Sequence, residues 1–398
     1  MVYAVPRSSS SPRHRLRPAA ALLAAAALVV SACSGTTSST TAPGVGAAGT
    51  SAAAASGSSA PILATLTGAE RTRVAGLISK AQSEGSLAWI DSIPVASTAQ
   101  AMFAAFQQEY GLPNLKLNYQ RLSTSKIASL LEQEVTAGKI TTDIAGAAFP
   151  KMWSQLKASN ALLQYTSPEA SNYTASAEYL DDNPGYWISS DAFGQVPIAN
   201  TKQFPTPITS WQDLLSPSLK GKVFMINPDA SSSMLYTYIA LRQVLPLSYF
   251  QQLAGQVGGF STGSSVADVQ AVTNGQDTVT ITVDFRPIQF ANTGVPMKSY
   301  YPKEGVLMLG QSYGIMANGP DQAAAELFED FLLSTQGQQI YVNKEGVTPA
   351  RSGVTMSPAL LQYSPKSVND VTLLKFDWNT PQATLDQYKN EFNQVFHR

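Results

Sequence analysis

Apolar residues recur at helical or strand spacing along most of the chain after residue 68. In the first unit, residues 74–81 place apolar side chains three and four positions apart, Gly85 ends this pattern, and residues 87–90 are an apolar run. The spacing predicts a helix and then a buried strand. Two more units follow in the same order, with helices at 103–110 and 127–135 and strands at 115–119 and 143–145. Alternating helices and strands predict an α/β fold with a mostly parallel sheet.

In the second half of the chain, apolar residues again recur at helical or strand spacing, but the predicted elements lie farther apart along the sequence. Strands are predicted at 196–201, 223–226 and 279–283, a short helix at 211–215, and a helix with a clear apolar stripe at 324–332. With 398 residues, the chain is long enough for two hydrophobic cores of ordinary size.

The N-terminus has a different pattern. Residues 1–33 contain four arginines and no acidic residue, and residues 19–30 are an apolar run too short to span a membrane comfortably, which predicts a signal peptide. The run leads to Cys33, the only cysteine, in a context that resembles the lipobox of bacterial lipoproteins. We therefore expect lipidation at Cys33. The alternatives are an ordinary signal peptide with an incidental cysteine and an uncleaved membrane anchor.

Composition narrows the classes of function. Residues 34–67 are rich in Ser, Thr, Ala and Gly, which predicts a flexible tether. Without the first 33 residues, 22 basic residues stand against 27 acidic ones, so no basic excess indicates nucleic-acid binding. His14 and His397 are the only histidines, which argues against histidine-based catalysis.

Six short fragments then occur in a recognisable order, at residues 85–89, 106–111, 143–144, 219–223, 301–305 and 331–337. In this order they resemble the type 2 periplasmic binding proteins of ABC importers, closest to the branch of ferric-iron, thiamine, phosphonate and polyamine binders. The resemblance covers about residues 68–353.

The resemblance implies an α/β fold of two lobes with a hinge cleft. Lobe one would comprise 68–190 and 300–398, and lobe two 195–295. It implies a binding protein rather than an enzyme, without a cofactor. The chain would be exported, anchored to the outer face of the cell membrane through Cys33, and monomeric, and it would close around a small-molecule solute for an ABC permease.

In open α/β sheets, ligands bind where strands end and helices begin. Four predicted loops and an expected crossing strand before residues 302–305 therefore supply the candidate ligand-binding residues: Ser92, Ser123, Thr124, Ser125, Ser231, Ser232, Ser233, Asp284, Arg286 and Tyr301. Most of them have an alternative interpretation. The residues at 123–125 and 231–233 could only cap helices, and Asp284 and Arg286 could pair with each other instead of contacting a ligand. Four aromatic residues, Trp89, Trp153, Tyr186 and Trp187, are more typical of packing than of ligand stacking.

The iron-binding pattern of the resembled branch is absent. Its ferric members have paired tyrosines where Asp284 and Phe285 stand here, a glutamate near Ala148, and often a histidine in the loop at 91–94. Tyr300 and Tyr301 are adjacent, but they are expected on a crossing strand outside that loop. Because ferric iron requires anionic oxygen ligands, no metal site is predicted.

The sequence thus predicts a binding protein for a small polar organic solute that bears an anionic group, an amine or both. A ferric-iron binder of the same family, a lipoprotein that presents its ligand to a sensor kinase, and a secreted enzyme on this fold remain alternatives. The enzyme fits least well, because no G-x-S-x-G elbow or metal-spaced cluster is present.

Overall fold

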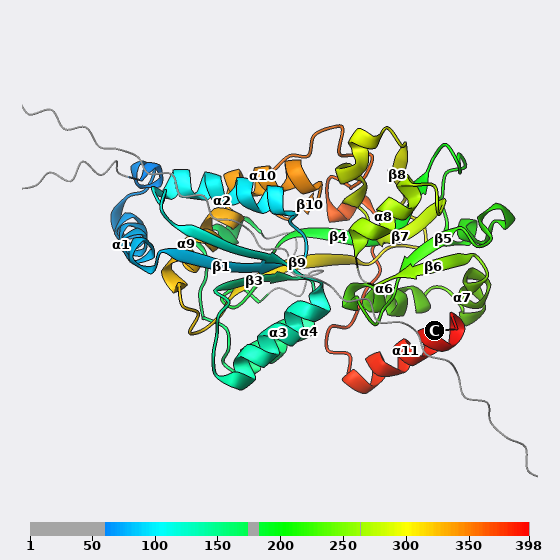
Figure 1. The fold of residues 1–398 in the computed structure, drawn as a ribbon, viewed down its shortest axis with the longest axis horizontal. Helices are drawn as coiled ribbons and strands as arrows, with labels where there is room; N and C mark the ends of the chain where they lie inside the picture. Colours follow the sequence, from blue (N-terminus) through cyan, green and yellow to red (C-terminus); the bar gives the residue numbers. More distant parts are fainter. Residues whose placement is uncertain (1–59, 174–182, 263, 398) are drawn as a thin grey trace, which may run out of the picture. The chain divides into compact units, whose positions relative to one another are not determined.

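The computed structural model describes residues 60–173, 183–262 and 264–397 (Figure 1). The predicted signal peptide, Cys33 and residues 34–59 of the predicted tether lie outside these ranges. A 3-10 helix, η1 (Pro61–Ala64), packs against the first two α-helices. The chain is therefore folded before residue 67, where the predicted tether was expected to end.

The first half alternates helices with strands as predicted. The elements are α1 (Gly68–Glu84), β1 (Ser86–Asp91), α2 (Ala96–Tyr110), β2 (Lys116–Arg121), α3 (Thr124–Ala137), β3 (Ile144–Ala147), α4 (Pro150–Ala158) and the 3-10 helix η2 (Pro168–Asn172). Gly85 and Gly111 end α1 and α2 with φ of 84° and 64°, a left-handed conformation that glycine adopts without strain. Both predicted helix ends are confirmed.

The second half contains the remaining elements. They are β4 (Ile188–Asn200), η3 (Trp211–Leu215), η4 (Pro217–Leu219), β5 (Val223–Ile226), α6 (Ser232–Arg242), α7 (Leu247–Ala254), β6 (Val257–Ser261), α8 (Ser265–Thr273), β7 (Val279–Val283), η5 (Arg286–Thr293), β8 (Met297–Ser299), β9 (Met308–Ile315), α9 (Gln322–Leu333), α10 (Thr335–Glu345), β10 (Thr348–Pro349), η6 (Val368–Asp370) and α11 (Gln382–Val395). The strands predicted at 223–226 and 279–283 coincide with β5 and β7. The strand predicted from residue 196 is the second part of β4, which begins at Ile188.

One strand path connects the whole described part. Its order is β2, β1, β3, β9, β4, β7, β5 and β6, with β8 and β10 each paired to β4. β1 is parallel to β2 and β3, and β5 is parallel to β6 and β7, whereas β4 and β9 run antiparallel to their neighbours. β4 pairs with β9 up to Gly194 and with β7 from Gln195 onward. This is the two-lobed α/β fold with β4 crossing between the lobes; the residue boundaries of the lobes stay a prediction.

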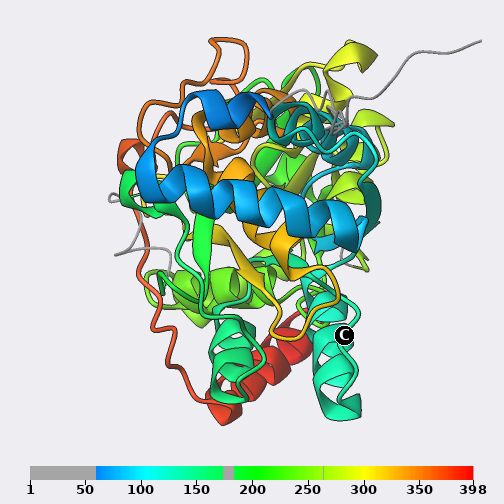
Figure 2. The ribbon, with the colours of Figure 1, turned by 90° about the vertical axis from the view of Figure 1, so that its left-hand side faces the viewer.

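Successive side chains of β1 point to opposite faces of its sheet, and helices cover both faces. Trp89 points to the face covered by α2 and α9, where its ring centroid lies 4.9 Å from that of Phe328 and Phe328 lies 5.3 Å from Phe106. Ile90 points to the opposite face, into a cluster with Trp153 of α4. Figure 2 looks onto α1, which packs against α9 at this end of the sheet. The two faces fix β1, so the loop that follows it starts from a rigid support.

The C-terminal helix packs on helices of the second half of the chain. Helix α11 lies against α6 and α7 (Figure 1), and Glu391 accepts hydrogen bonds from Arg242 Nε at 2.8 Å and from Tyr238 OH at 2.7 Å. The sequence grouped residues 300–398 with 68–190. The packing of α11 instead favours assigning this helix to the lobe that contains residues 195–295.

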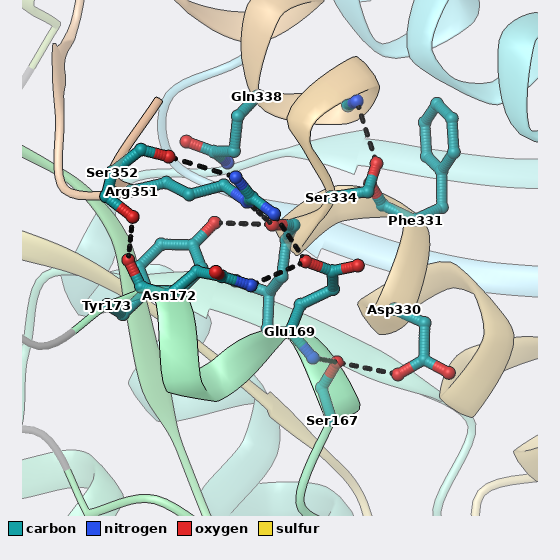
Figure 3. A network of polar contacts seen from close by, with 12 residues as sticks. Ser167, Glu169, Asn172, Tyr173, Asp330, Phe331, Ser334, Gln338, Arg351 and Ser352 are labelled. Carbon is teal, nitrogen blue, oxygen red and sulfur yellow. Dashed lines mark hydrogen bonds and ion pairs between the residues drawn. The ribbon is translucent and has the colours of Figure 1, made fainter. Parts of the chain in front are cut away.

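A polar network joins η2 to the corner between α9 and α10 (Figure 3). Arg351 Nη2 lies 2.6 Å from Glu169 Oε2, and Asn172 donates to the same oxygen at 3.0 Å. Ser167 donates to Asp330 at 2.7 Å. These contacts lie among side chains that do not line the cavity described below, so we interpret the network as structural.

Candidate functional site

A cavity of about 350 Å³ opens where the strands end. Its lining comes from the loops that follow β1, β2, β5, β6 and β7, and from Phe193 and Gln195 within β4. The volume lies within the range of pockets that bind small organic ligands. Its place, at the carboxyl ends of parallel strands, is where open α/β sheets bind ligands.

The cavity brings together six of the predicted site residues. Ser92, Ser123, Thr124, Ser231, Ser233 and Arg286 all line it. Ser125 and Ser232 are not part of the described lining, because a helix turns by about 100° per residue and each of them follows a lining residue in a first helical turn.

Three helices begin at this cavity. Ser123, Ser231 and Ser264 are the N-cap residues of α3, α6 and α8, and all three line it. In the described structure the side chains of Ser123 and Ser231 make no capping hydrogen bond, whereas Ser264 accepts one from Ala267 N. Capping therefore does not account for the hydroxyls of Ser123 and Ser231, two of the residues for which the sequence left it open. Helix N-termini carry free N–H groups and a partial positive charge, which favour an anion.

Three cationic side chains line the cavity, and the described lining contains no Asp or Glu. Two of them, Arg121 and Lys126, flank the start of α3. Arg121 is half-buried and donates from Nε to the carbonyl of Ser92 at 3.3 Å, so it sits beside the loop after β1. The third cation, Arg286, comes from the segment that follows β7.

Arg286 is held rigidly, with 1% of its surface exposed. Its Nε donates to Ser265 Oγ at 3.0 Å, its Nη1 donates to Glu345 Oε2 at 3.3 Å, and its guanidinium lies 4.7 Å from the ring centroid of Phe285. Burial, together with repulsion from Arg121, lowers the pKa of Arg286 to about 10, so it remains charged at neutral pH. An anionic ligand would relieve this repulsion.

Glu345 is the carboxylate that balances Arg286. It is fully buried at the end of α10, and its Oε1 accepts a hydrogen bond from Val95 N at 2.9 Å, at the start of α2. Its Oε2 also accepts from Gln289 Nε2 at 2.8 Å. Glu345 thus ties Arg286 to α2 and α10, and a pair between Asp284 and Arg286, one of the two predicted alternatives, is wrong.

Asp284 lies outside the described lining of the cavity. It is fully buried, and its carboxylate accepts hydrogen bonds from Gly194 N at 3.1 Å, Phe285 N at 2.9 Å and Tyr301 OH at 2.9 Å. Burial raises the pKa of Asp284 to about 7. Its carboxylate is directed to β4 and to Tyr301, whereas Arg286 lies against α8 and α10. The structure therefore does not support Asp284 as a cleft residue.

Tyr301 is also placed away from the cavity lining. Its hydroxyl lies 2.9 Å from Asp284 Oδ2 and 2.8 Å from the carbonyl of Tyr363. The sequence put Tyr300 and Tyr301 on a crossing strand, but β8 ends at Ser299 and the strand that crosses is β4. Tyr301 anchors the Asp284 network.

The aromatic residues pack as the sequence favoured. Trp89, Trp153 and Trp187 are buried in the hydrophobic clusters. Tyr186 packs against the cluster that contains Trp153 and Trp187, and Lys157 Nζ lies 4.3 Å from the centroid of the Tyr186 ring. The described cavity lining includes none of the four.

The sequence missed several polar lining residues: Arg121, Lys126, Gln195, Thr262, Ser264 and Ser265. Arg121 lies two residues after the strand predicted at 115–119, and Lys126 lies just before the helix predicted at 127–135, so the rule that ligands bind between strand ends and helix starts could have found both. Thr262, Ser264 and Ser265 follow β6, whose Gly-rich sequence gave no strand signal. Gln195 lies inside β4, so a rule that considers only the ends of strands could not have identified it.

Two kinds of feature are absent from the described residues. Across 60–173, 183–262 and 264–397, no three His, Cys, Asp or Glu side chains are grouped as metal ligands would be. Within the same ranges no helix combines the length and apolarity needed to cross a membrane.

Comparison with known proteins identifies the fold and a family. Residues 140–377 match the family described as bacterial extracellular solute-binding protein. The solved structures that resemble this chain include the periplasmic binding protein AfuA from Actinobacillus pleuropneumoniae with fructose-6-phosphate bound, which has 18% sequence identity and a TM-score of 0.63 and matches 78% of this chain and 97% of its own.

Iron-bound HitA from Pseudomonas aeruginosa has 18% identity and a TM-score of 0.61, with coverage of 78% of this chain and 99% of its own. The substrate-binding protein of an ABC transporter from Agrobacterium tumefaciens has 14% identity and a TM-score of 0.66, with coverage of 78% and 94%. At these identities the likeness shows the fold alone. The structures similar in fold include binders of different solutes, so the ligand must be argued from the cavity itself.

Proposed function

Because the chain belongs to the bacterial extracellular solute-binding proteins, we propose that it captures a small organic anion with a phosphate-like group and delivers it to an ABC importer. One observation carries the proposal: three cations and three helix starts surround a cavity whose described lining has no carboxylate. Closure of the lobes around the ligand would then present a closed form to the permease.

The charges around the cavity favour a doubly charged anion. Arg121, Lys126 and Arg286 line it, and buried Glu345 balances one of them. The remaining excess of positive charge suits a phosphate monoester, which carries about two negative charges near neutral pH. Arginine side chains, hydroxyls and helix N-termini are the groups that recognise such an anion.

The same lining argues against the other ligand classes that the sequence left open. An amine would need an acidic or other strong acceptor group, and Asp284, the carboxylate expected to provide it, lies outside the lining. Ferric iron would need anionic oxygen ligands, and the described lining offers neither carboxylates nor tyrosines.

Thermal-shift and calorimetric titration with a panel of probes tests the proposal. We expect organic phosphates to raise the melting temperature in a concentration-dependent way, and putrescine and ferric chloride to leave it unchanged. Arg121→Gln should weaken phosphate-ester binding about tenfold or more. It should leave the melting temperature of the empty protein unchanged or higher, because Arg121 repels Arg286. Stabilisation by ferric iron alone would contradict the proposal.

Export and lipid anchoring at Cys33 are the second part of the proposal. The arginine-rich start, the apolar run at 19–30 and the lipobox-like residues before Cys33 support it. Two acyl chains at one site suffice for stable attachment. We expect wild-type protein in the membrane fraction of a bacterial host and Cys33→Ser in the fluid outside that membrane. Equal partition of the two proteins would refute lipidation at Cys33.

A further inference from the structure

Gln195 occupies a distinctive position in the cavity. It is the first residue of β4 that pairs with β7, directly after the residues that pair with β9. Its side chain lines the cavity, although only 1% of the residue is exposed. Gln195 therefore contacts the cavity from the strand that crosses between the lobes.

One end of the Gln195 amide belongs to a chain of hydrogen bonds. Nε2 donates to Ser233 Oγ at 3.0 Å, and Ser233 Oγ lies 2.8 Å from Ser231 Oγ. When Nε2 donates to Ser233, Ser233 can donate to Ser231, and the Ser231 hydroxyl is left to donate into the cavity. This direction of donation is the one that an anionic ligand requires.

The other end of the amide has no partner. Gln195 Oε1 is buried and accepts no hydrogen bond from any described residue. A buried polar atom left unpaired costs about 1–3 kcal/mol, and native structures contain few of them. The described lining side chains that carry charge are all donors. Gln195 Oε1 is thus a buried oxygen that can only accept, on a residue that lines a cavity whose charged side chains are all donors.

We infer that Gln195 forms a second subsite, in which Oε1 accepts a hydrogen bond from a hydroxyl group on the organic part of the ligand. This inference rests on the proposed function and narrows it: the ligand is a hydroxyl-bearing organic phosphate, such as a polyol or sugar phosphate, rather than inorganic phosphate or an alkyl phosphate. The anion is held by the cations and serines, and Gln195 selects the body attached to it.

Calorimetric titration with two matched pairs of probes tests this subsite. Glycerol 3-phosphate is compared with propyl phosphate, and ribitol 5-phosphate with pentyl phosphate; within each pair only the hydroxyls differ. For wild-type protein we expect the hydroxylated member of at least one pair to bind tenfold or more tightly. Gln195→Met should reduce this preference to less than threefold. Ser233→Ala should weaken both members similarly and keep the preference, because it removes the partner that orients the Ser231 hydroxyl toward the anion but leaves Oε1 in place.

The outcomes separate the inference from the proposed function. If all four esters bind wild-type protein but neither pair differs, or if Gln195→Met keeps the preference, the subsite is refuted while phosphate recognition stands. If none of the four esters binds, the proposed function fails, and the inference fails with it.

Discussion

Replacing Arg286 with methionine is expected to weaken the binding of an organic phosphate by about 100-fold or more. The guanidinium is held in place by Ser265 and Glu345, so it meets a ligand anion with little loss of side-chain entropy. Truncating one member of a desolvated, hydrogen-bonded charge pair commonly costs about 2–5 kcal/mol of binding free energy. Calorimetric titration with a phosphate ester that binds wild-type protein measures the loss.

The buried partner of Arg286 must be considered with it. Arg286→Met alone leaves the buried Glu345 without its cationic partner, which should lower the free energy of unfolding by about 3–5 kcal/mol. Arg286→Met combined with Glu345→Gln removes both charges and should restore stability without restoring binding. Arg71→Met, on the exposed surface of α1, is the matched control and should change neither property. Wild-type affinity in the stable double variant would show that Arg286 does not bind the anion.

Replacing Asp284 with alanine is expected to destabilise the protein by about 3 kcal/mol, because two buried N–H donors lose their acceptor. These donors are Gly194 N and Phe285 N, whereas Tyr301 OH keeps the carbonyl of Tyr363 as an acceptor. Since Asp284 does not line the cavity, ligand affinity measured well below the melting temperature should remain close to wild type. Chemical denaturation and titration of the same preparation measure the two quantities.

A surface aspartate provides the comparison for Asp284→Ala. Asp229 pairs with Lys389 at 2.8 Å, with about 40% of each side chain exposed, and an exposed pair of this kind is worth roughly 0–1 kcal/mol. Asp229→Ala should therefore change stability much less than Asp284→Ala. Weaker binding by Asp284→Ala with unchanged stability would reverse the conclusion and return Asp284 to the ligand site.

Most of the fold could be predicted because its signals are local. Gly85, Gly111 and Gly138 end helices wherever the apolar period stops, and the runs at 223–226 and 279–283 are strands with these same limits. The extent of β4 and the position of α11 could not be predicted. Both depend on which segments far apart in the sequence pair or pack together, and the spacing of apolar residues carries no information about these contacts.

The site was predictable in part for a related reason. Ser123 and Ser231 were found because a strand end followed by a helix start is visible in the sequence. Asp284 was misplaced because it shares its loop with Arg286, and only the structure shows that their side chains have different partners. Arg121 completes the cationic lining from another loop, so the charge of the cavity appears only when the loops are assembled.

Mass-spectrometric identification of the compound that the protein captures from a bacterial metabolite extract tests the central claim most directly. Wild-type protein and the Arg286→Met, Glu345→Gln double variant are incubated with the extract, washed and denatured, and the released small molecules are compared. The account predicts that a hydroxylated organic phosphate is enriched by wild-type protein and not by the variant. Enrichment of an amine or of iron by wild-type protein, or equal enrichment by both proteins, would contradict it.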